Sequence, residues 1–109
     1  MFWEKYNIDY VYMNKQKEIM KYSNPALVYK KAKIIFNEFE LGLSTRINKK
    51  YMIKGKFTKD KWVHFGEMGY EDFTKHGDTF RQQLFKNRNK AWSSSSKNTP
   101  AFLSYHLLW

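Results

Sequence analysis

The sequence contains no cysteine, only two prolines and no long apolar run among its 109 residues. Without cysteine, neither disulfide bonds nor thiolate metal sites can hold the fold together. No apolar segment approaches the ~20 residues that a membrane-spanning helix requires. The first residues also lack the basic and apolar regions of a secretory signal. At this length we expect one domain with a modest core and no transmembrane segment.

Acidic residues are scarce: there are 10, against 20 lysines and arginines, which gives a formal net charge of +10. The imbalance is uneven along the chain. Residues 44–61 carry seven basic groups and one acidic group, and residues 75–109 carry six and one. The segment between them, residues 62–74, carries three acidic groups and no basic one. Two basic blocks of this kind need an anionic partner or ample solvent.

The clearest helix signal begins at Asn24-Pro25. Asparagine is a good N-cap, and proline fits the first helical position because its missing N–H would have no partner there. An apolar stripe with helical spacing follows, and Gly42 is a plausible stop. The stripe consists of Val28, Ala32, Ile35, Phe36 and Phe39.

Strand-like and helical segments follow in turn. Short strands are predicted at Leu43–Ile47, Tyr51–Phe57 and Lys61–Phe65, with turns at residues 48–50 and 58–60. Helical segments are predicted at residues 70–76 and 79–92, with Asp78 as a cap, and a last turn from Thr99-Pro100 leads into a buried apolar end. The sequence therefore predicts an α+β fold, a small antiparallel three-stranded meander packed with about three helices.

Residues 63–78, VHFGEMGYEDFTKHGD, combine two histidines, four carboxylates, three glycines and three aromatic residues. Three interpretations are open. His64, Asp72, His76, Asp78 and His106 are the candidate ligands of a metal site, although their spacing matches no recognised pattern. Glu71, Asp72 and His76 are candidates for acid–base catalysis. Packing is the favoured interpretation, with Phe65, Tyr70 and Phe73 in the core, so we expect no enzyme activity, metal or cofactor.

The same segment carries a resemblance. Residues 44–78, STRINKKYMIKGKFTKDKWVHFGEMGYEDFTKHGD, closely resemble a domain family of unknown function in large nucleocytoplasmic DNA viruses, the giant viruses of algae and protists. The preceding NPALVYKKAK and the terminal LSYHLLW also fit, so the resemblance covers residues 24–109. Ile47 stands where that family usually has lysine, and residues 79–90 hold fewer arginines than is usual. The resemblance implies a viral origin and no established activity.

The basic blocks are the candidate binding surface. Two groups are predicted to bind phosphates, one on the sheet and one on the helix after residue 78. They comprise Arg46, Lys49, Lys50, Lys54, Lys56, Lys59, Lys61, Arg81, Lys86, Arg88 and Lys90. The leading hypothesis is a small virion protein that binds nucleic acid, most simply DNA, without sequence specificity. The alternative is a minor capsid or cement protein that docks on larger, acidic capsid proteins.

Residues 1–23 lie outside the resemblance and are predicted to form an interaction arm, with one basic α+β domain at residues 24–109. The arm is rich in aromatic residues, which are enriched at protein interfaces. They are Phe2, Trp3, Tyr6, Tyr10 and Tyr12. Self-association through this arm is a further expectation, and the expected location is the virion, with host cytoplasm or viral factory during infection.

Overall fold

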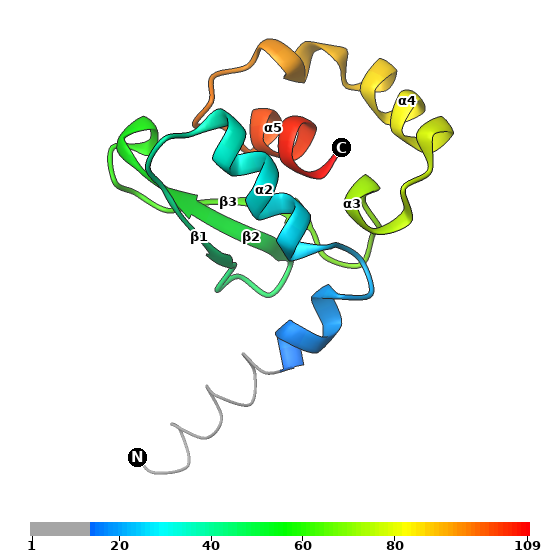
Figure 1. Cartoon of the computed structure of the whole chain (residues 1–109), viewed down its shortest axis with the longest axis horizontal. Helices are drawn as coiled ribbons and strands as arrows, with labels where there is room; N and C mark the ends of the chain where they lie inside the picture. Colours follow the sequence, from blue (N-terminus) through cyan, green and yellow to red (C-terminus); the bar gives the residue numbers. More distant parts are fainter. Residues whose placement is uncertain (1–13) are drawn as a thin grey trace.

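The computed structural model of the chain describes residues 14–109 and shows the expected α+β fold (Figure 1). No helix in this part of the chain is both long enough and apolar enough to cross a membrane. The elements, in chain order, are a helical segment at residues 14–19, α2 (Pro25–Ile35), β1 (Glu40–Leu43), β2 (Lys49–Lys54), the 3₁₀ turn η1 (Lys56–Thr58), β3 (Val63–Glu67), α3 (Phe73–His76), α4 (Thr79–Arg88), the 3₁₀ turn η2 (Lys90–Ser94), α5 (Pro100–Leu103) and the π-helical turn η3 (Ser104–Leu108).

The three strands form one antiparallel sheet in the order β1-β2-β3, which confirms the predicted meander. The predicted strand bounds were wrong by several residues. The β1–β2 turn begins at Ser44, whose N–H donates to the carbonyl of Lys50, and Lys49 N–H donates to the carbonyl of Arg46. This turn uses residues that were predicted to extend the first strand, so β1 begins earlier and β2 includes Lys49 and Lys50.

Helix α2 begins as predicted and ends early. The side chain of Asn24 accepts a hydrogen bond from Leu27 N–H, and Pro25 occupies the first turn. The helix was predicted to continue to Gly42, yet it stops at Ile35 because Phe36 is extended. The Phe36 ring stacks on that of Phe57, with centroids 4.0 Å apart. Tertiary packing therefore overrides the continuous apolar stripe.

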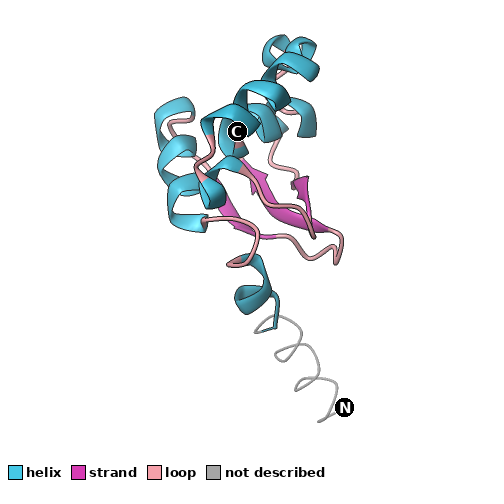
Figure 2. Ribbon diagram, turned by 90° about the vertical axis from the view of Figure 1, so that its right-hand side faces the viewer, coloured by secondary structure: helices cyan, strands magenta, loops and turns pink. Residues whose placement is uncertain are grey.

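The core lies between the sheet, α2 and the C-terminal turns. Tyr51, Ile53 and Phe65 point from one face of the sheet towards Val28 and Ala32 of α2, and all five side chains are buried. In Figure 2, α2 and the C-terminal helical turns lie to one side of the sheet. The predicted burial of the apolar end is confirmed, since the core also contains Phe102, Leu103, Leu107 and Leu108.

Residues 14–23 belong to this folded body. Ile19 is 1% exposed in the core, and the buried Ser23 hydroxyl accepts a hydrogen bond of 2.7 Å from Tyr51. The domain therefore includes this stretch, which was predicted to be part of the arm, and removing it would open the core. The aromatic residues predicted for the arm, Phe2, Trp3, Tyr6, Tyr10 and Tyr12, lie outside the described residues.

Several side chains predicted to be buried lie at the surface. Tyr70 is 72% exposed, so its assignment to the core was wrong, and Phe73 is half-buried. Helix α4 ends at Arg88 and not at Trp92, and none of its residues is buried. Phe80 and Leu84 on this helix are 67% and 46% exposed. Helix α4 is therefore a peripheral element with apolar side chains on its surface.

Two aromatic residues from the same segment give a matched stability test. We expect Phe65→Ala to lower the free energy of unfolding by about 3–5 kcal/mol, because a fully buried ring leaves a cavity. Tyr70→Ala should change it by less than about 0.5 kcal/mol, as for most surface substitutions. Urea denaturation of both variants measures the difference. Equal destabilisation by the two substitutions would contradict this core.

Candidate functional site

The acidic segment contains a buried ion pair. Lys50 Nζ lies 3.1 Å from Asp72 Oδ2, and the two side chains are only 3% and 1% exposed. Lys50 also donates to the carbonyl of Tyr70 at 2.5 Å. Burial lowers the pKa of Lys50 even though the Asp72 carboxylate, which favours the charged lysine, opposes this shift. The pair ties β2 to the loop that precedes α3.

The ion pair extends into a wider network of hydroxyl groups. Asp72 Oδ1 accepts from the backbone N–H of Thr74 at 3.0 Å and from its hydroxyl. Thr74 Oγ1 in turn accepts from Asn24 N–H at 2.9 Å and lies 3.1 Å from Ser23 Oγ, to which Tyr51 donates. We call Ser23, Lys50, Tyr51, Asp72 and Thr74 the polar centre. Burial also raises the pKa of Tyr51, which keeps its hydroxyl protonated as the donor.

The groups of the polar centre are closed off from solvent and bonded to one another. Asp72 is 1% exposed and both of its oxygens are occupied by protein donors, so a substrate from solvent has no route to the carboxylate. Asp72 additionally caps α3, and Gly77 ends that helix with φ of 62°. This geometry supports the packing interpretation of the segment over acid–base chemistry.

The other candidate ligands make separate hydrogen bonds, although the Nε2 atom of His76 is buried without a partner. His64 Nδ1 lies 2.6 Å from Ser44 Oγ, and His106 Nε2 lies 3.0 Å from the carbonyl of Ser93. His76 Nδ1 accepts from the N–H of Asp78, whose own side chain caps α4. Within residues 14–109, no three histidine or carboxylate side chains come close enough together to hold a metal ion.

The first basic group does not form one surface patch. Lys50 was expected in an exposed turn, and this was wrong, because its side chain belongs to the polar centre. Lys49 pairs with Glu67, and Lys54 pairs with Glu40 at 3.2 Å. The remaining exposed members lie at opposite ends of β2: Arg46 in the β1–β2 turn, and Lys56, Lys59 and Lys61 in the β2–β3 connection.

The second basic group lies on α4 and the turn that follows it. Residues 79–109 carry five basic side chains and no acidic one. Arg81, Arg88 and Lys90 are exposed, and Lys86 Nζ lies 5.2 Å from the ring centroid of Tyr105. Figure 1 shows α4 at the periphery of the molecule. We call Arg81, Lys86, Arg88 and Lys90 the cationic face.

One lysine beside this face was not among the predicted binding residues. Lys31 of α2 lies near Lys86, and burial followed by repulsion from Lys86 lowers the pKa of the Lys31 ammonium. Its Nζ also lies 5.7 Å from the ring centroid of Phe73. The two lysines are far apart in the chain, with the whole sheet between them, so the sequence carries no signal for this proximity. Helix α2 therefore adds a positive charge to the cationic face.

Comparison with known proteins identifies similarity without an activity. Residues 39–89 match a family described as "Family of unknown function (DUF5754)". The matched span contains the three strands, α3, α4 and the Lys50–Asp72 pair. The resemblance to a family of unknown function is thus confirmed for these residues. No curated protein and no solved structure matches the chain.

The polar centre leads to a prediction about two adjacent lysines. Lys50→Ala leaves the Asp72 carboxylate buried without its cation, so we expect a loss of about 3–5 kcal/mol in the free energy of unfolding. Lys49→Ala removes a partly exposed pair with Glu67 and should cost less than about 1 kcal/mol. Chemical denaturation distinguishes these outcomes, and similar values for both variants would rule out a structural role specific to Lys50.

The lowered pKa values of two histidines predict how stability depends on pH. Burial, with repulsion from Arg81, lowers the pKa of His76 below 6.5, and burial also lowers that of His64. Below pH 6.5 the unfolded chain therefore binds more protons at these histidines than the folded chain does. The free energy of unfolding falls as the pH drops from 6.5 through the folded pKa values. Melting temperatures between pH 7.5 and 5 should decrease, and less so in His76→Gln. An unchanged slope in that variant would show that His76 does not contribute.

Proposed function

We propose that this chain is a small, basic, non-enzymatic protein that binds nucleic acid through backbone phosphates without reading the base sequence. One observation carries the proposal. The cationic face presents four basic side chains from residues 79–90, a stretch that holds no acidic group. A surface of one sign attracts a polyanion, and its counter-ions are released when the phosphates bind.

The geometry of α4 fits a phosphate backbone. Arg81 and Arg88 are seven residues apart, which places them on one side of the helix and about 10 Å apart along its axis. Each strand of duplex DNA presents a phosphate every ~3.4 Å of axis, so the two arginines reach different phosphates. Phe80 and Trp92 are 67% and 37% exposed beside these cations, and exposed aromatic rings can stack on unpaired bases.

The viral setting of the proposal rests on the sequence resemblance. The motifs of residues 44–78 resemble those of a family in large nucleocytoplasmic DNA viruses. A protein that neutralises phosphates without sequence preference suits the packaging of a long genome. We therefore place the protein in the virion, in contact with viral DNA, and in the host cytoplasm or viral factory during infection.

One observation favours a second candidate, a minor capsid or cement protein. Phe80 and Leu84 occupy one side of α4 and are 67% and 46% exposed, and Ile34 of α2 is 85% exposed. Apolar side chains on a peripheral helix are a means of docking on another protein. In that case the basic residues would meet acidic capsid proteins and not phosphates.

The test compares two triple variants that remove the same charge. Arg81→Gln/Arg88→Gln/Lys90→Gln removes three cations from the cationic face. With four or five phosphates engaged, we expect a slope near −4 for log affinity against log salt on duplex DNA, and a slope shallower by roughly 3 in this variant. Fluorescence anisotropy with two unrelated duplexes and one single strand measures the slope and any sequence preference.

The matched control is Lys56→Gln/Lys59→Gln/Lys61→Gln, which removes three exposed cations from the β2–β3 connection, next to Asp60. This variant should retain most of the affinity and of the salt dependence. An equal loss of affinity in both variants would indicate that DNA is attracted by the net charge of the protein and not by the cationic face. No binding to any of the probes near physiological salt would favour the capsid alternative.

A further inference from the structure

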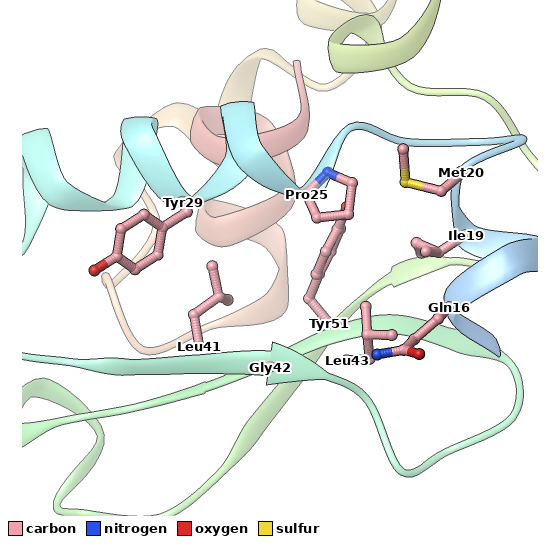
Figure 3. A pocket seen from close by; sticks show the side chains of 9 residues that line it. All are labelled: Gln16, Ile19, Met20, Pro25, Tyr29, Leu41, Gly42, Leu43 and Tyr51. Atoms are coloured by element: carbon pink, nitrogen blue, oxygen red, sulfur yellow. The ribbon is translucent and has the colours of Figure 1, made fainter. Parts of the chain in front are cut away.

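An apolar groove lies on the side of the molecule away from the cationic face, between the helical segment 14–19, the start of α2 and strand β1. Its volume is about 340 Å³. Figure 3 shows Tyr29 and Leu41 towards one end, and Gln16 beside Leu43 towards the other. The full lining is Gln16, Ile19, Met20, Pro25, Tyr29, Leu41, Gly42, Leu43 and Tyr51.

The strand that borders the groove has an open hydrogen-bonding edge. Strand β1 is an outer strand of the sheet, and Ser44 N–H donates to the carbonyl of its direct partner Lys50. Hydrogen-bonded and non-hydrogen-bonded pairs alternate along an antiparallel ladder. The N–H and C=O groups of Leu41 and Leu43 therefore point away from β2, along the outer edge of the sheet that borders the groove. An edge of this kind accepts an extended peptide as an added strand.

We propose that the groove is the docking site for residues 1–13 of a second copy of this chain. In this segment Ile8, Tyr10 and Tyr12 alternate with other residues, so an extended conformation would place all three side chains on one face. That face meets the apolar lining, while the segment backbone pairs with Leu41 and Leu43. Reciprocal exchange of the two segments gives a closed dimer with two-fold symmetry.

Charge and size both fit this partner. Residues 1–13 contain two acidic residues and one basic residue, whereas residues 14–109 contain 19 basic and eight acidic residues. The segment is thus attracted to the body of another copy. Its five aromatic side chains, at about 150 Å² each, would bury ~750 Å² per segment. Two segments would bury ~1,500 Å², which is the area of a typical stable interface.

The direction of the described chain favours a neighbouring copy over the same chain. Lys15 Nζ donates to the carbonyls of Ser44 and Arg46 at 2.5 and 2.6 Å, which fixes the helical segment 14–19 against the β1–β2 turn. This helical segment forms one wall of the groove and starts at the outer edge of the molecule (Figure 1). To enter its own groove, the chain before residue 14 would have to fold back around this wall, whereas the groove of another copy requires no such reversal.

The first measurement is the oligomeric state of the full chain by sedimentation velocity over 1–200 μM. We expect a monomer–dimer equilibrium in this range. Tyr29→Glu places a carboxylate in the groove at a side chain that is 48% exposed, and it should weaken the dimer at least tenfold. Ile34→Glu is the matched control on the same helix, at an 85% exposed side chain outside the groove, and should leave the equilibrium unchanged.

The second measurement identifies the occupant. A photo-crosslinking residue replaces Tyr29, and equal amounts of ¹⁵N-labelled and unlabelled full chains are mixed before illumination. Crosslinks from position 29 to residues 1–13 that join labelled and unlabelled peptides support the proposal. A chain that is monomeric throughout, a dimer insensitive to Tyr29→Glu, or crosslinks confined to a single copy would each overturn it. Far-ultraviolet circular dichroism verifies that both glutamate variants are folded.

Discussion

The buried pair between Lys50 and Asp72 is the constraint on which the rest of the fold depends. Two charges held away from water are stable only when each has its partner and further hydrogen bonds. Here Lys50 donates to the Tyr70 carbonyl in the loop before α3, and Asp72 accepts from the N–H of Thr74 in α3. The Thr74 hydroxyl in turn accepts from Asn24 N–H, which connects the pair to the start of α2. Gly66 allows the side chains of Lys50 and Leu108 to pack closely against the backbone of β3. Its φ is 81°, and a β-carbon at this position would lie 3.2 Å from Lys50 and 2.8 Å from Leu108. The ion pair therefore fixes the relative positions of segments that are distant in sequence.

Features with a local cause were predictable from the sequence, and features set by tertiary contacts were not. Asn24, Asp78 and Pro100 were assigned to helix starts, and the structure confirms each, because capping depends on a few neighbouring residues. The end of α2 was missed because Phe36 stacks on Phe57, which lies after β1 and β2 in the sequence and is brought close only by the fold. The strand bounds shifted for a similar reason, since the turn at residues 44–48 fixes the register.

The candidate site shows the same division. Adjacent lysines in a basic run look equivalent in sequence, yet Lys49 is partly exposed and Lys50 is buried. The difference comes from the loop before α3, whose Tyr70 carbonyl and Asp72 carboxylate bind the Lys50 ammonium. The sequence identified Arg81 and Arg88 as basic residues of one helix, and the structure places both at the surface. Lys31 could not be assigned to their neighbourhood, because only the packing of α2 near α4 brings it close to Lys86.

Helix α4 has no buried residue, and this affects how any ligand of that helix is held. Its attachments to the body include the stack of Phe85 on Trp109, at 4.3 Å between centroids, and the bond from Gln82 to the Trp109 carbonyl. A helix with so little buried surface can unfold locally at a small cost in free energy while the core stays folded. A ligand that binds only the helical form of α4 stabilises that form, so the free energy of local unfolding rises by the binding free energy. For the ligand proposed for the cationic face, ordering α4 would therefore reduce the net affinity, and a more firmly anchored helix would bind the same ligand more tightly.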